Sequence, residues 1–211
     1  GDSSQGNPTF EANPGGAPCN VLAMLNRLGK KTAFIGKVGN DMFGKQLKAA
    51  VEECGIDTRN LVMDDEIHTT LAFVHTYPDG DRDFSFYRNP GADMMLTKDE
   101  VDADLIRNSR IFHFGTLSST HEGVREATRY ALDVAKEAGC IITFDPNLRP
   151  PLWKDLNDAR KEIEYGIERC DVLKISDNEV EFLFDTTDYD KGAALIEEKY
   201  HIPLVLITMG K

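Results

Sequence analysis

Short apolar segments that alternate with amphipathic, helix-length segments are the feature that most constrains the fold of this chain. Five such segments have the length and composition of buried strands, and they lie at residues 32–35, 111–114, 141–144, 172–175 and 204–207. Helical periodicity occurs between the later ones, at residues 122–138, 158–170 and 189–199. Strands separated by helices form a parallel sheet with both faces covered, so we predict an α/β fold.

A different period appears between residues 68 and 88. Residues 70–75 and 83–88 are rich in strand formers, and the turn-forming sequence Pro78-Asp79-Gly80-Asp81 separates them. We predict a hairpin that stands off the main body and serves as a lid. The α/β core is then expected at 14–66 and 96–211, and the β lid at 8–13 and 67–95.

The net charge limits the kinds of partner that we expect, and the cysteines indicate the cellular compartment. With 36 acidic residues against 24 Lys and Arg, the formal net charge is -12, so nucleic acid and anionic membranes are poor candidates for partners. The four cysteines are far apart in the sequence and form no CxxC pair, which favours free thiols and a cytoplasmic protein. No apolar run approaches the ~18 to 20 residues of a membrane span.

Ligands of open α/β sheets bind beyond the carboxyl ends of the strands, and polar or glycine residues follow every predicted strand. Asp145, Asn147 and Arg149 stand at alternate positions after one strand, and in an extended segment they share a face. Arg149 is matched to a phosphate or carboxylate. An Asp-Pro turn with a solvated Arg is the alternative, and the spacing does not separate the two.

Candidate binding residues also follow two further predicted strands. Ser176 and Glu179 have the spacing of a capping box, and the helix start beside them is also a place for anions, where Glu179 could orient a metal-bound water. Thr208 and Gly210 lie in a small-residue turn that a nucleotide could approach. The motifs GxSxG, GxGxxG and GxxxxGK[ST] do not occur, so the sequence supports neither hydride transfer nor P-loop chemistry.

Near the N-terminus, Gly15 and Gly16 allow close approach of the backbone to a ligand, and Pro18 suits the first turn of a helix. Asn20 adds donors and acceptors at the same place. These residues predict either a small-molecule binding loop or a turn that merely starts a helix. Apolar residues at helical spacing follow, and Gly29 stands where that helix should end.

Five segments together resemble the PfkB (ribokinase-like) carbohydrate kinases, and within that family the fructokinases. They are GGAPCN at 15–20, FIGKVGNDMFG at 34–44, FYRNPGADMML at 86–96, DPNLRPPLW at 145–153 and KISDNEVEFL at 174–183. The resemblance implies a three-layer α/β/α core with a small β-sheet lid, and transfer of the ATP γ-phosphate to a primary hydroxyl of a sugar.

The resemblance also implies roles for single residues. Sugar contacts are implied for Gly15, Gly16, Asn20, Tyr87 and Arg88. Asn147 would bind substrate beside Arg149, the catalytic cation between sugar and phosphates. Ser176, Thr208 and Gly210 would bind the nucleotide, and Glu179 would hold Mg²⁺ through water.

Two parts of the family pattern are not in the sequence. These are a first strand with a sugar-binding Asp and a late Gly-Ala-Gly-Asp motif with the catalytic base. Gly91-Ala92-Asp93 lacks the second glycine and lies at the base of the lid. We therefore expect a chain truncated at both ends, with the base Asp beyond Lys211, and no activity of the chain alone.

The expected reaction is ATP-dependent phosphorylation of fructose to fructose 6-phosphate. A 2-keto-3-deoxygluconate kinase is one alternative, because Tyr87 and Arg88 would suit a carboxylate. A non-catalytic sugar-binding protein on the same scaffold is another. The apolar lid residues Leu71, Phe73, Phe84 and Phe86 also suggest a homodimer formed through the lid.

Overall fold

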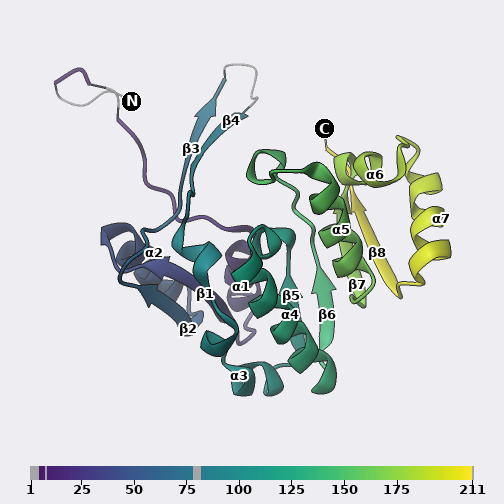
Figure 1. Cartoon of the computed structure of the whole chain (residues 1–211), viewed down its shortest axis with the longest axis horizontal. Helices are drawn as coiled ribbons and strands as arrows, with labels where there is room; N and C mark the ends of the chain where they lie inside the picture. The colour runs from purple at the N-terminus through teal and green to yellow at the C-terminus, as the bar shows by residue number, and fades with distance from the viewer. Residues whose placement is uncertain (1–4, 8, 78–81, 211) are drawn as a thin grey trace.

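The computed structural model describes residues 5–7, 9–77 and 82–210 (Figure 1). Strands β1 (Ala33–Gly39) and β2 (Asp57–Asp64) form a parallel pair, and β3 (Leu71–Thr76) pairs with β4 (Arg82–Tyr87) in an antiparallel hairpin. A parallel sheet follows in the order β5 (Ile111–Phe114), β6 (Ile141–Phe144), β7 (Val172–Ser176) and β8 (Leu204–Thr208). The predicted α/β class is confirmed.

Helices occupy most of the segments between these strands. The α-helices are α1 (Ala17–Arg27), α2 (Met42–Glu53), α3 (Ala103–Arg107), α4 (Glu122–Glu137), α5 (Leu156–Ile167), α6 (Asp177–Phe184) and α7 (Tyr189–Tyr200). Short 3-10 turns are η1 (Ala92–Met95), η2 (Lys98–Glu100), η3 (Thr116–Ser119) and η4 (Pro150–Leu152). None of the helices in the described ranges has both the length and the apolarity needed to cross a membrane.

The predicted strands of the second half agree with the structure to within one residue, but β2 is a correction. The sequence analysis found no strand at 57–64, whereas this segment pairs with β1 from Ala33 opposite Asp57 to Gly39 opposite Asp64. Its first four residues are polar, so it lacks the apolar run on which the prediction depended. Its burial comes instead from Asn60 and Leu61, both about 5% exposed.

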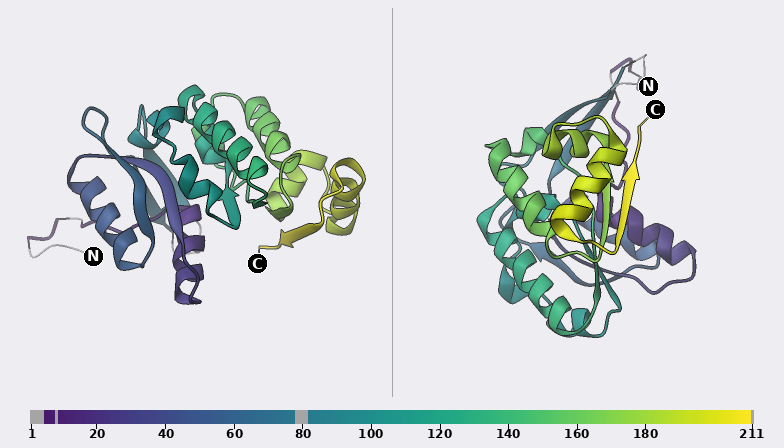
Figure 2. Two further views of the ribbon diagram at one scale, coloured as in Figure 1. Left: turned by 90° about the horizontal axis from the view of Figure 1, so that it is seen from below. Right: turned by 90° about the vertical axis from the view of Figure 1, so that its right-hand side faces the viewer.

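The main core lies between the four-stranded sheet and helices α5, α6 and α7. Phe144, Leu173 and Ile175 of the sheet pack with Ile163 of α5 and Ile196 of α7, all nearly inaccessible to solvent. Full burial of one such side chain contributes about 1.5 to 3 kcal/mol. A second core joins α4 to α3 and to the segment before it. Figure 2 shows α4 and α5 over the same face of the sheet.

On the opposite face of this sheet, some apolar residues are partly exposed within the described residues. Ile111, Ile141, Leu204 and Leu206 are each about half exposed, at 55%, 48%, 48% and 48%. Because side chains alternate along a strand, these four point away from their buried neighbours. Apolar composition identified the strands correctly and overestimated how much of each is buried.

The lid hairpin of β3 and β4 extends away from the rest of the molecule (Figure 1). The Phe73 ring of β3 packs edge-on against Phe10 at 5.1 Å and Tyr87 at 5.4 Å, so Phe10, before α1, contacts the hairpin. The predicted turn at 78–81 lies outside the described residues. The exact division into core and lid stays a prediction.

Candidate active site

A large open cavity of about 2630 Å³ brings together residues that are distant in the sequence. Gly15, Gly16 and Asn20 line it from the start of α1, and Asn147 and Arg149 line it from the loop after β6. Residues of β1 and β5 form further parts of its wall. The two loops that the sequence analysis singled out separately therefore face one common space.

The backbone conformation at the start of α1 explains why a glycine stands at position 16. Gly16 is the N-cap of α1 with φ of 123°, a conformation that side chains with a Cβ rarely adopt. Its carbonyl accepts a hydrogen bond from the Asn20 amide at 3.0 Å. The side chain of Asn20 is exposed, and Gly29, with φ of 76°, follows the helix end as predicted. The helix start thus offers an accessible amide on a fixed turn.

The loop after β6 is held from both sides by its neighbours. Thr116 of η3 donates from its amide and its hydroxyl to the Pro146 carbonyl, at 3.1 and 2.6 Å. On the other side, the Leu148 amide donates to Glu179 Oε1 at 2.7 Å. Asn147, between these anchors, has φ of 47°, which asparagine tolerates better than most residues. Its backbone is therefore fixed while its side chain lines the cavity.

Charged and titratable groups surround this loop. Arg149 donates from Nη1 to the Leu148 carbonyl at 3.0 Å and is half-buried in the cavity wall. Lys174 of β7 lies 3.2 Å from Asp145 and balances that carboxylate. Burial lowers the pKa of His113, an effect that the nearby Asp145 and a hydrogen bond with Thr143 oppose only in part.

The nucleotide-side candidates lie together at the ends of β7 and β8. Ser176 and Thr208 are opposite each other in the sheet register, and Ser176 caps α6 in the predicted capping box with Glu179. The Gly210 amide donates to Asp177 Oδ2 at 2.9 Å, and this hydrogen bond holds the pKa of Asp177 below its usual range. These residues do not line the cavity, so the candidates form two neighbouring groups.

Glu179 contacts both the loop after β6 and the start of α6, so its surroundings bear on the predicted metal role. It is only 5% exposed, and its two oxygens accept from the amides of Leu148 and Ser176 at 2.7 and 2.8 Å. The described residues contain no cluster of three or more His, Cys, Asp or Glu groups that would chelate a cation directly. The role of Glu179 toward a metal therefore stays a prediction, and the contacts observed for its carboxylate are the two backbone amides.

The two predicted sugar contacts of the lid, Tyr87 and Arg88, differ in their exposure to solvent. Tyr87 is 67% exposed at the end of β4. The Arg88 side chain is 5% exposed, and its guanidinium contacts Asp93, Thr120 and the Leu117 carbonyl. Contact between Arg88 and a sugar therefore stays a prediction, because in this structure its donors are directed at protein groups.

Asp41 is a structural residue of the site region that the sequence analysis did not single out. It caps α2, and it accepts from the amide and the hydroxyl of Thr69, just before the lid, both at 2.8 Å. Burial acts to raise the pKa of Asp41, but the hydrogen bonds from Thr69, Gly44 and Phe43 outweigh it and bring the pKa to about 2. An Asp directly before a helix is an N-cap signal that would have found it.

The parallel sheet, the lid hairpin and the strand-exit loops have the ribokinase-like fold, which the similar solved structures share. The chain belongs to the pfkB family of carbohydrate kinases, whose family model matches residues 1–211.

Individual relatives are consistent with this family. The chain is 42% identical over 211 residues to a protein of Arabidopsis thaliana described as "Probable fructokinase-3", which covers all of this chain and 61% of that protein. A fructokinase from Xylella fastidiosa with bound ATP superposes with a TM-score of 0.82 at 34% identity, over 92% of this chain and 60% of that one. A fructokinase from Vibrio cholerae O395, in its fructose, ADP and calcium ion bound form, superposes with a TM-score of 0.82 at 29% identity, over 93% and 63%. The chain thus spans about three fifths of the length of these relatives.

Proposed function

We propose that the complete protein phosphorylates fructose with ATP to give fructose 6-phosphate. The observation that carries this proposal is the single cavity lined by Gly16, Asn20, Asn147 and Arg149, next to the candidate nucleotide group at Ser176 and Thr208. A sugar on the first side and a nucleotide on the second would meet at the loop after β6. The similarity to a fructokinase crystallised with fructose and ADP supports this choice of substrates.

Each side of the cavity has a separate task in this proposal. Gly15 and Gly16 let a sugar approach the backbone, and Asn20 hydrogen-bonds its hydroxyls. Asn147 holds the sugar from the opposite wall, and Tyr87 reaches it from the lid. Holding both reactants in one geometry removes much of the entropic barrier of a two-substrate reaction.

Charge stabilisation is the task of Arg149. Phosphoryl transfer spreads negative charge over the transferring group, and a guanidinium stabilises it because its planar fork matches phosphate oxygens. Support for this role comes from the position of Arg149 in the cavity wall, where it donates to the Leu148 carbonyl and where Glu179 anchors the loop. The general base is proposed to be an Asp beyond Lys211.

The nucleotide side takes ATP and a divalent cation in this proposal. Ser176, Thr208 and Gly210 approach the nucleotide from the ends of β7 and β8. Mg²⁺ supplies charge neutralisation for the phosphates when it is bound, and Glu179 accepts from one of its waters. The Glu179 carboxylate is already oriented for this contact by two backbone amides.

The experiment that tests the function is a substrate panel with the purified complete protein. ADP formation is measured with Mg²⁺-ATP and fructose, glucose, ribose or 2-keto-3-deoxygluconate, and the position of the phosphate is read by ³¹P and ¹³C NMR. We expect kcat/KM to be highest for fructose, with the phosphate on O6. Preference for 2-keto-3-deoxygluconate, or fructose binding without turnover, would each contradict the proposal.

The proposal includes two further properties, a homodimer and a cytoplasmic location. The lid residues Phe73 and Phe84 are each 37% exposed and Val74 is 52% exposed, which suits pairing with the lid of a second copy. A single monomeric species in sedimentation at micromolar concentration would contradict this homodimer. A cytoplasmic location is proposed because the four cysteines are free and two of them are buried thiols.

A further inference from the structure

One carboxylate joins the two strands of the lid at their base. Asp93 Oδ1 accepts from the Thr70 hydroxyl at 2.5 Å, and Thr70 directly precedes β3. Asp93 Oδ2 lies 2.8 Å from Nε and 2.6 Å from Nη2 of Arg88, which directly follows β4. A Cβ at Gly91 would lie 1.8 Å from the Thr70 hydroxyl, so glycine is required for this approach. Asp93 thus fixes where both lid strands leave the core.

The other edge of Arg88 binds the core. Its Nη1 donates to the Thr120 hydroxyl at 2.7 Å and its Nη2 to the Leu117 carbonyl at 3.0 Å. Leu117 belongs to η3 at the exit of β5 and lines the cavity. Because a guanidinium is planar and its donors have fixed directions, these contacts fix the angle between the lid and η3.

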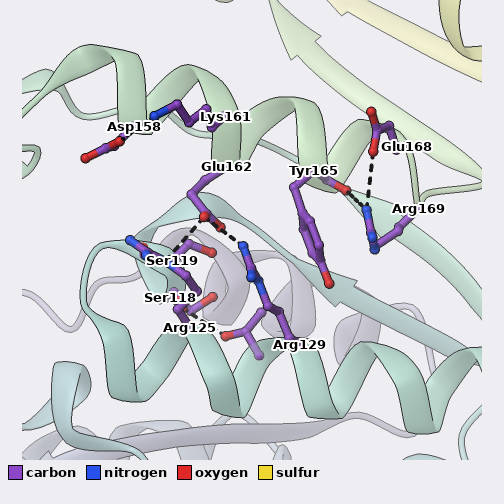
Figure 3. A network of polar contacts seen from close by, with 11 residues as sticks. Ser118, Ser119, Arg125, Arg129, Asp158, Lys161, Glu162, Tyr165, Glu168 and Arg169 are labelled. Carbon is purple, nitrogen blue, oxygen red and sulfur yellow. Dashed lines mark hydrogen bonds and ion pairs between the residues drawn. The ribbon is translucent and has the colours of Figure 1, made fainter.

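Helices α4 and α5 hold η3 in place. Figure 3 shows Glu162 of α5 pointing toward Arg125 and Arg129 of α4, at 3.3 Å from Arg125 Nε and 3.0 Å from Arg129 Nη2. Arg125 Nε also donates to the Ser119 carbonyl at 3.0 Å. Thr128 of α4 donates to the Ser118 carbonyl at 2.9 Å. Arg88 therefore attaches the lid to a rigid support.

We propose that Asp93 and Arg88 form a latch that sets the position of the lid over the cavity, with Asp93 as a positioning residue for sugar binding. The lid side chains Phe73, Phe84 and Phe86 line the same cavity as Asn20, so a change in lid angle changes the sugar site. The nucleotide group at the ends of β7 and β8 has no part in the latch. The latch therefore acts on fructose and leaves ATP unaffected, and this prediction rests on the proposed function.

The test compares Asp93→Asn with Asp99→Asn in the complete protein. Both variants replace a carboxylate by an amide, and Asp99 is exposed on η2 a few residues further on. Thr70→Val, which removes one hydroxyl of the latch, is the second variant in case Asp93→Asn folds poorly. The readouts are hydrogen–deuterium exchange of peptides from β3, β4 and the four-stranded sheet, and KM for fructose and for ATP.

We expect Asp93→Asn to increase exchange in the lid at least ~10-fold without change in the four-stranded sheet, and to raise KM for fructose ~10-fold with KM for ATP within twofold. Asp99→Asn should change neither. Unchanged lid exchange would overturn the latch whatever the enzyme's substrate is, since exchange needs no turnover. Faster exchange throughout the protein, or faster lid exchange with an unchanged KM for fructose, would overturn the positioning role.

Discussion

Helix α1 and helix α5 have similar amphipathic sequences and very different surroundings. No residue of α1 is buried; its apolar residues Val21 and Met24 are 38% and 55% exposed, and its C-cap Leu28 is 65% exposed. Helix α5 buries five residues, among them Ile163 and Ile167, which are at most 1% exposed. The sugar-side loop therefore stands on a thinly packed helix, and the loop after β6 is anchored in the main core. The difference predicts that substitutions near α1 affect ligand binding, whereas those beneath the sheet affect stability.

The largest expected effect is on stability and tests this comparison in both regions. Ile163→Ala removes a fully buried side chain and should lower the free energy of unfolding by about 2 to 5 kcal/mol. Met24→Ala, at a position 55% exposed, should change it by less than about 0.5 kcal/mol. Urea unfolding of the complete protein measures both values. Similar losses in the two variants would show that α1 is packed as tightly as α5.

The next largest effect concerns the anchored loop and is on catalysis. Arg149→Lys keeps the charge and loses the planar fork, so kcat should fall roughly 10- to 1000-fold, which corresponds to ~1.4 to 4 kcal/mol of transition-state stabilisation. The free energy of unfolding should be unchanged, because Arg149 is only half-buried and its one hydrogen bond is to the adjacent carbonyl. Steady-state kinetics with saturating fructose and ATP give kcat. An unchanged kcat would return Arg149 to the role of a solvated turn residue.

A smaller effect, on stability, is expected at Asp41, which caps α2 and accepts a hydrogen bond from Thr69 shortly before β3. Its folded-state pKa of about 2 lies below the ordinary 3.8, so the ionised carboxylate stabilises the fold above pH ~4. This contribution, about 2 kcal/mol by the difference in pKa, is lost as the pH falls from ~4 toward 2. Asp41→Asn should therefore be less stable than the parent at pH 7, and the gap should shrink below pH 4. A gap independent of pH would contradict the assignment.

The sequence predicted the parts of the fold that depend on local pattern. The strands of the four-stranded sheet and the cap of α6 at Ser176 follow from apolar runs and from a four-residue motif, and both were correct. Strand β2 was missed because its pairing with β1 stabilises a segment that begins with four polar residues.

Part of the candidate site was also predictable from local sequence pattern. The rule that ligands bind beyond strand ends identified Asn147 and Arg149 as candidates, and the glycine pair identified Gly15 and Gly16. The two predictions together implied that these residues line one cavity. The contacts of Asp93 and Arg88 were not predictable, because Thr70 lies 23 residues from Asp93, Thr120 lies 32 residues from Arg88, and no motif connects them. Likewise, no motif indicated that backbone amides occupy both oxygens of Glu179.

The most direct test of the account is the kinetic behaviour of Asn20→Ala in the complete protein, with Gly16→Ala beside it. Loss of the Asn20 amide leaves sugar hydroxyls without partners, at ~1 to 3 kcal/mol in binding. A Cβ at Gly16 is strained at φ of 123°, and in the proposed sugar site it would also intrude on the sugar. The account predicts that both variants raise KM for fructose at least ~10-fold and leave KM for ATP within twofold. Equal increases in both KM values, or a loss of thermal stability with neither KM changed, would contradict it.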